Sequence, residues 1–227
     1  MARRTAVLLV SLAVATSCHR AETPPERPSP VPLIRHGFPP DADRARRQLD
    51  GLTVARAGDG EAYQRVAFGE TWTDETDAPG GRNGCDTRDD VLHRDLAAAE
   101  PGGPEDCVPR SGVLHDPYTG RVLPYSPRTA SRIETDHVVA LGAAWRAGAW
   151  AWTPEQRLTY ANDLDVLLAV DGQANHDKSS RTPDQWKPRR AYWCEYGRRW
   201  TGIKSKYALT VTPSEKAALH EMLGTCP

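Results

Sequence analysis

The sequence is short of several features that would place a chain of 227 residues in a broad functional class. Its formal net charge is −1, which argues against a protein that coats DNA through bulk positive charge. It contains no Cys-x-x-Cys pair, so a zinc site built from closely spaced thiolates is not expected. Its amino-terminal apolar run, residues 5–15, is too short for a membrane-spanning helix. Hydrophobic residues still make up 39% of the chain, which suits one domain with a real core.

The amino terminus has the layout of a secretory signal. Two arginines precede the apolar run, and small residues come directly before Cys18. We therefore assign residues 1–17 to a signal peptide and predict that the protein acts outside the cytoplasm. The residues before the cysteine also resemble a lipobox, in which Cys18 would carry a lipid anchor and make the protein a membrane-anchored lipoprotein. The alternative is an ordinary cleaved signal with an incidental cysteine.

A proline-rich stretch at residues 18–40 separates the leader from the rest of the chain and has few apolar residues to bury. We predict that it is an extended tether, and that residues 41–227 form the folded domain. Local patterns in that domain predict an α+β fold in which helices predominate. Helices are expected at residues 41–49, 87–99, 141–149, 154–160, 173–179, 190–206 and 213–224, and strands at 122–125, 132–139 and 166–170.

The domain contains an even set of cysteines, namely Cys85, Cys107, Cys194 and Cys226. In an exported chain such a set predicts two disulfides that staple the fold. Three pairings are possible. Proximity in the sequence favours Cys85 with Cys107 and Cys194 with Cys226.

Four polar residues form the most informative constellation in the chain. Asp136 and His137 are adjacent in a short strand-like run, and Asn175 and Lys178 follow about one helical turn apart. A carboxylate and a carboxamide oxygen suit a hard divalent cation, and an imidazole can take a proton from water near neutral pH. A lysine can contact a phosphate.

These residues belong to an ordered series of motifs. The series is Gly84-Cys85-Asp86-Thr87-Arg88, Val91-Leu92-His93-Arg94-Asp95, Asp116-Pro117-Tyr118-Thr119-Gly120, Asp136-His137-Val138-Val139, Ala161-Asn162-Asp163, Leu167-Leu168-Ala169-Val170 and Ala174-Asn175, followed by Lys178, Pro183, Trp186, Cys194 and Cys226. In this series the chain resembles the secreted bacterial HNH endonucleases, also called His-Me finger or ββα-metal nucleases. The resemblance covers roughly residues 45–226.

The resemblance implies a role for each residue of the constellation. His137 would be the general base that activates water. Asp136 and Asn175 would hold one divalent cation, most simply Mg²⁺, with Mn²⁺, Ca²⁺ and Zn²⁺ as alternatives. Lys178 would assist catalysis by binding a phosphate, or would pair with a neighbouring carboxylate.

The resemblance also implies a hairpin in which residues 122–125 pair with residues 132–139, followed later by the short helix of the ββα-metal motif. One position departs from the family pattern. Val166 stands where the family has an asparagine that holds the loop bearing the histidine, and a valine side chain offers neither donor nor acceptor. This departure puts the level of activity in doubt more than the fold.

Substrate contacts are expected from Arg88, Arg94, Lys178 and Arg181. Arg88 and Arg94 could instead form structural ion pairs with nearby acids. From residue 177 to residue 206, nine Lys or Arg residues stand against three Asp or Glu residues, which suits a phosphate backbone or a solvated helix face. No element resembles a base-reading device, so little sequence specificity is expected.

The sequence thus predicts a metal-dependent endonuclease of low sequence specificity that cuts DNA, with RNA as a second candidate substrate, outside the cytoplasm. Nucleic acid is the expected partner. Membrane contact is expected only through Cys18, and no protein partner is implied. The alternative is a surface-anchored nucleic-acid-binding or structural module whose HNH site is attenuated or inactive, and Val166 is the feature that favours it.

Overall fold

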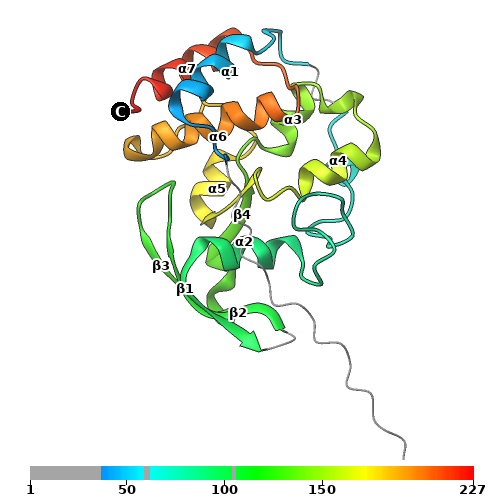
Figure 1. Cartoon of the computed structure of the whole chain (residues 1–227), viewed down its shortest axis with the longest axis vertical. Helices are drawn as coiled ribbons and strands as arrows, with labels where there is room; N and C mark the ends of the chain where they lie inside the picture. The colour runs from blue at the N-terminus through cyan, green and yellow to red at the C-terminus, as the bar shows by residue number, and fades with distance from the viewer. Residues whose placement is uncertain (1–36, 59–61, 104–105) are drawn as a thin grey trace, which may run out of the picture. The chain divides into compact units, whose positions relative to one another are not determined.

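The computed structural model describes residues 37–58, 62–103 and 106–227 (Figure 1). The predicted signal peptide, Cys18 and most of the predicted tether lie outside the described residues. None of the helices in the described part of the chain has the length and apolar character needed to cross a membrane.

The fold is a mixed α+β arrangement of helices and two small antiparallel sheets. The helices are α1 (Ala42–Gly51), α2 (Thr87–Asp95), α3 (Leu141–Arg146), α4 (Pro154–Ala161), α5 (Gly172–Lys178), α6 (Trp193–Lys206) and α7 (Pro213–Leu223), with short 3-10 helices η1 (Arg65–Phe68), η2 (Pro127–Arg132), η3 (Ala149–Ala151) and η4 (Arg190–Tyr192). One sheet has the order β1 (Leu96–Gly103), β2 (Asp106–His115), β3 (Val122–Tyr125), and the other pairs β4 (Ile133–His137) with β5 (Leu167–Asp171).

The pairing of the strands corrects the hairpin predicted from the sequence. Residues 122–125 form β3, which pairs with β2, while residues 133–137 form β4, which pairs with β5 so that Asp136 lies opposite Leu168. The 3-10 helix η2 lies between β3 and β4 and redirects the chain, which prevents the two strands from forming a hairpin. The expected helix at residues 87–99 is also shorter, because the chain leaves the helix after Asp95 and continues as β1.

Strand β5 is buried on both faces, which explains its continuous apolar run. Side chains alternate along a strand, so Leu167 and Ala169 contact the apolar cluster around α2 and the three-stranded sheet. Leu168 and Val170 contact the larger cluster formed with the remaining helices. The β4–β5 pair is therefore held between two apolar clusters, and the end of β4 is a rigid place from which to present side chains.

The carboxy-terminal helices form a layer with α1, and Figure 1 shows α1, α6 and α7 side by side. Capping boxes begin two of the expected helices, one opening α4 at Thr153 and one opening α7 at Thr212. Both predicted disulfides are confirmed. The Cys194–Cys226 bond joins α6 to the end of α7, and the Cys85–Cys107 bond joins the residue before the cap of α2 to β2.

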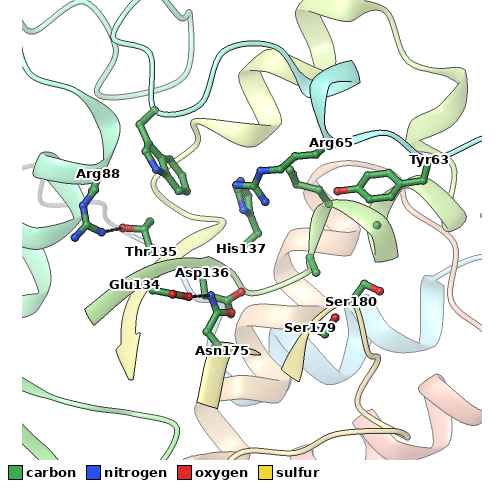
Figure 2. A pocket seen from close by; sticks show the side chains of 14 residues that line it. Tyr63, Arg65, Arg88, Glu134, Thr135, Asp136, His137, Asn175, Ser179 and Ser180 are labelled. Carbon is green, nitrogen blue, oxygen red and sulfur yellow. Dashed lines mark hydrogen bonds between the residues drawn. The ribbon is translucent and has the colours of Figure 1, made fainter. Parts of the chain in front are cut away.

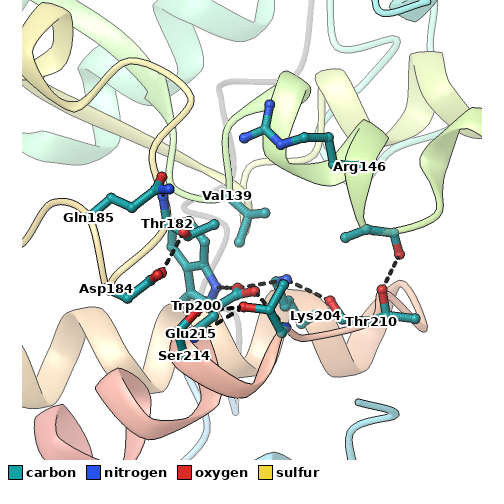
Figure 3. A network of polar contacts seen from close by, with 12 residues as sticks. Val139, Arg146, Thr182, Asp184, Gln185, Trp200, Lys204, Thr210, Ser214 and Glu215 are labelled. Atoms are coloured by element: carbon teal, nitrogen blue, oxygen red, sulfur yellow. Dashed lines mark hydrogen bonds and ion pairs between the residues drawn. The ribbon is translucent and has the colours of Figure 1, made fainter. Parts of the chain in front are cut away.

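A buried charged network fastens α6 to α7 (Figure 3). Lys204 Nζ donates to Glu215 Oε1 and to the Thr210 carbonyl, each at 2.6 Å, and Trp200 Nε1 donates to the same Glu215 oxygen at 2.6 Å. Lys204 and Glu215 are each 1% exposed. Glu215 is also the glutamate of the α7 capping box, so one residue both starts the helix and neutralises a buried cation.

Replacing Glu215 with glutamine should lower the free energy of unfolding by about 3 kcal/mol, because Lys204 would lose its buried counter-ion. The side-chain amide oxygen of the glutamine could still accept the hydrogen bond from Trp200, so the variant tests the loss of charge alone. Urea unfolding with both disulfides intact measures the effect. Glu195→Gln is the control, because its carboxylate pairs with two arginines nearer the surface and should contribute less than about 1 kcal/mol. Equal effects of the two variants would contradict this account.

Candidate active site

Asp136, His137 and Asn175 line one cavity of about 490 Å³ (Figure 2). Asp136 and His137 come from the end of β4, and Asn175 comes from α5, which follows β5 directly. Helix α5 is capped by the Asp171 side chain, which accepts from the backbone N–H of Ala174. The antiparallel strands and the short helix after them thus bring together residues that lie about forty positions apart in the sequence.

His137 is buried and is held in one tautomer. Its Nε2 lies 2.9 Å from the carbonyl oxygen of Ala161. Because a carbonyl can only accept, Nε2 carries the proton and Nδ1 keeps its lone pair. The imidazole stacks on Trp72, with ring centroids 5.4 Å apart, and lies almost parallel to Tyr160 on a centroid distance of 6.3 Å.

Burial lowers the pKa of His137 from its usual range to about 3. The hydrogen bond to Ala161 opposes this shift, and the positive charges of Arg65 and Lys178 add to it. The imidazole is therefore neutral at ordinary pH. A general base must be unprotonated before the reaction, and a neutral imidazole with its Nδ1 lone pair meets that condition, although so low a pKa weakens its affinity for the proton.

Asp136 is also buried, and both of its oxygens have partners. The hydroxyl of Tyr118 donates to Oδ2 at 2.6 Å, and Lys178 Nζ donates to Oδ1 at 2.9 Å. Lys178 donates as well to the carbonyl oxygen of His137 at 2.9 Å, and its side chain is fully buried. Burial raises the pKa of Asp136, while the Lys178 charge and the Tyr118 hydrogen bond oppose that shift. Lys178 thus takes the second of the two roles expected from the sequence, pairing with a carboxylate.

Asn175 is oriented by Glu134, which lies two residues before Asp136 on β4. The Asn175 amide donates to Glu134 Oε2 at 2.8 Å, and His176 Nε2 lies 3.0 Å from Glu134 Oε1. This arrangement leaves the amide oxygen of Asn175 as the atom that could bind a ligand in the cavity.

The donor set fits one hard divalent cation. The Asp136 carboxylate and the Asn175 amide oxygen are the oxygen ligands that Mg²⁺ prefers, with water completing the shell. No group of three or more His, Cys, Asp or Glu residues suited to a metal occurs among residues 37–58, 62–103 and 106–227. Because both donors are oxygen atoms, a soft or thiolate-bound metal is poorly matched to these residues, and a cation would share Asp136 with Lys178.

The predicted substrate arginines lie in three different settings. Arg88 lines the cavity, but its guanidinium donates to Thr135 Oγ1 and to the carbonyls of Ala130 and Ile133. Arg94 does not line the cavity.

Arg94 is instead a structural residue, because it pairs with Asp95 and donates to the carbonyls of Leu164 and Leu167 at 2.6 and 2.7 Å. Arg181 also lies outside the cavity lining and donates to the Asp177 carbonyl. The basic stretch does not form one continuous face, since Lys204 is buried and Lys206 pairs with Asp163 at 2.5 Å.

Val166 keeps the site ordered without an asparagine side chain. Its backbone carbonyl accepts from the backbone N–H of Val138 at 2.8 Å, directly after His137. Its side chain is fully buried. A main-chain hydrogen bond therefore holds the segment bearing the histidine, and an asparagine introduced here would place an amide in an apolar environment.

Three residues of the site escaped the sequence analysis. Tyr118 could have been found, because it lies within the Asp-Pro-Tyr-Thr-Gly turn, a motif of the series to which no role in the site was assigned. Asp116 of that turn accepts from the backbone N–H of Asp171 at 2.9 Å and so anchors Tyr118 beside β5. Trp72 and Arg65 line the cavity itself, and no sequence signal marks them because they precede the motif series.

Comparison with known proteins identifies a family for this chain. The family described as GmrSD restriction endonucleases, C-terminal domain, matches residues 86–222, which include β4, β5 and α5. The chain belongs to this family. Membership of the GmrSD C-terminal family supports a nuclease-type hydrolase, with nucleic acid as its substrate.

One relative that is described as secreted is also similar to this chain. An "Uncharacterized secreted protein" of Arthroderma benhamiae is 39% identical over 202 residues, covering 88% of this chain and 92% of the relative. This relative comes from a fungus, so the bacterial origin expected for the family is not confirmed. No solved structure matches the chain.

Proposed function

We propose that this protein is a metal-dependent endonuclease that hydrolyses phosphodiester bonds of DNA, and of RNA as a second substrate, outside the cytoplasm. The observation that carries the proposal is the neutral, single-tautomer His137 beside the buried Asp136 in one cavity. Strands β4 and β5 with helix α5 are the segment that we equate with the ββα-metal motif. The N-terminal anchor through Cys18 and the low sequence specificity belong to the same proposal.

Each residue of the site has its own role in the proposed reaction. Nδ1 of His137 takes a proton from the attacking water, while the Ala161 carbonyl holds the Nε2 proton and fixes the ring. Asp136 and Asn175 would hold the cation, with Mg²⁺ as the expected ion. When bound, the cation would neutralise charge that develops on the phosphate and on the departing oxygen. Tyr118 and Lys178 orient the Asp136 carboxylate, and Glu134 orients Asn175.

Metal-dependent nicking of supercoiled plasmid tests the proposal directly. We expect the purified protein, with both disulfides formed, to convert the plasmid to its open-circular form in Mg²⁺ or Mn²⁺ and to be inactive in EDTA. The reason is that the cation held by Asp136 and Asn175 would supply the positive charge that stabilises the phosphate and the departing oxygen, and EDTA would remove it. Cleavage that proceeds unchanged in EDTA would refute the metal requirement, and absence of cleavage in every metal would refute the enzyme.

The second candidate is a nucleic-acid-binding module with an inactive site. The buried ion pair between Asp136 and Lys178 favours it, because the carboxylate expected to bind the metal is already neutralised. Binding of duplex DNA that persists in Mg²⁺ or Mn²⁺ without any cleavage would support this module and exclude the endonuclease.

A further inference from the structure

Arg65 is a cationic side chain at the mouth of the cavity whose donors are free. It is exposed, it lines the cavity, and no hydrogen bond or ion pair joins it to another residue in the described part of the chain. Figure 2 shows its guanidinium extending towards His137. A guanidinium carries five N–H donors, so several are available to a ligand in the cavity.

The backbone that carries Arg65 is firmly anchored. Arg65 begins the short helix η1, and Phe68 at the end of this helix is buried, with its ring 6.3 Å from Trp145 and 6.1 Å from Tyr160. Arg157 Nε donates to the Ala67 carbonyl at 2.8 Å and fastens the helix from outside. These contacts hold the Cα of Arg65 in place, which keeps the charge of its side chain near the cavity.

The other cations that reach this part of the molecule are already engaged. Arg88 donates to three oxygens of β4 and the preceding η2 segment. Lys178 is fully buried between Asp136 and the His137 carbonyl. Within the described residues that line the cavity, Arg65 is therefore the cation that can meet an incoming anion without breaking an existing contact.

We propose that Arg65 binds a non-bridging oxygen of the scissile phosphodiester and stabilises the negative charge that grows there during cleavage. This assignment rests on the proposed nuclease function and adds a substrate-binding residue to it. A guanidinium makes short, charge-assisted hydrogen bonds to phosphate oxygens, and such contacts lower the barrier when charge develops on the bound oxygens. The ligand class is the phosphate backbone of a nucleic acid, since no base-specific group accompanies Arg65.

The test compares Arg65→Ala and Arg65→Lys with the control Arg47→Ala. Arg47 is an exposed arginine on α1 that does not line the cavity. Two measurements are made on one short DNA duplex, namely kcat/KM for its cleavage in Mn²⁺ and its binding in EDTA across a salt series. Arg65→Ala should lower kcat/KM by roughly 10- to 100-fold. It should also reduce the slope of log affinity against log salt by about one. Arg65→Lys should recover part of the rate, because it restores the charge but not the planar fork.

The outcomes separate this inference from the function on which it rests. Wild type that binds and cuts, with Arg65→Ala indistinguishable from Arg47→Ala in kcat/KM, would overturn the role of Arg65 and leave the nuclease intact. A loss of binding in EDTA without a loss of kcat/KM would also overturn it, because it would mark a general surface charge. Wild type that neither binds nor cuts would overturn the proposed function and this inference together.

Discussion

Replacing His137 with asparagine should abolish cleavage, lowering kcat by at least about 1000-fold, because the variant has no group that can take a proton from water. Asparagine keeps a polar side chain and fills part of the space between Trp72 and Tyr160. His137→Ala is a poorer choice, since it would leave a larger cavity in a buried region. Single-turnover cleavage of plasmid in Mg²⁺ and Mn²⁺ measures the effect.

His93→Asn is the matched control for that experiment. The Nε2 atom of His93 also lies against a backbone carbonyl, that of Cys107 at 2.8 Å, but His93 is exposed and does not line the cavity. The control should retain cleavage within about twofold, since surface changes away from the site rarely exceed ±0.5 kcal/mol. Retention of activity by His137→Asn, in protein that is folded and free of contaminating nuclease, would remove His137 from the mechanism.

Replacing Lys178 with methionine should lower the free energy of unfolding by about 3–5 kcal/mol, because it leaves the buried Asp136 carboxylate without its counter-ion. Lys178→Met combined with Asp136→Asn should lose less stability than the sum of the two single variants. A coupling of about 1–3 kcal/mol is expected for two residues in direct contact. Urea unfolding at pH 7 with the disulfides intact measures all three variants.

Lys187→Met supplies the comparison for Lys178. Lys187 also pairs with a carboxylate, that of Glu221, but the Glu221 side chain is 53% exposed, so its loss should cost less than about 1 kcal/mol. If the effects of Lys178→Met and Asp136→Asn were simply additive, the two residues would not form an energetically coupled pair.

Local signals in the sequence predicted the parts of the structure that depend on neighbouring residues. The capping boxes at Thr153 and Thr212 begin α4 and α7, because a cap is made by residues three positions apart. The cysteine pairs are the ones favoured by proximity along the chain. Asp136, His137 and Asn175, which belong to the motif series, line one cavity of the fold.

Long-range pairing was not visible in the sequence. The run at residues 133–137 could join any apolar strand, and β5 became its partner because β5 can be buried between two apolar clusters. The helix from Thr87 was expected to reach Ala99, yet the chain turns at Leu96 to pair with Leu114 of β2. Strand pairing is decided by contacts between distant segments, so local propensity cannot select it.

The roles of the charged residues were decided by the tertiary structure alone. The sequence by itself determined which residues could supply a base, a metal ligand and a disulfide, because those capacities belong to the side chains. It could not determine that Arg94 would hold the carbonyls of Leu164 and Leu167, or that Lys178 would be buried against Asp136. Nor did it mark Arg65. A cation binds whichever oxygen the fold places beside it, and its availability to a substrate is known only when its other partners have been placed.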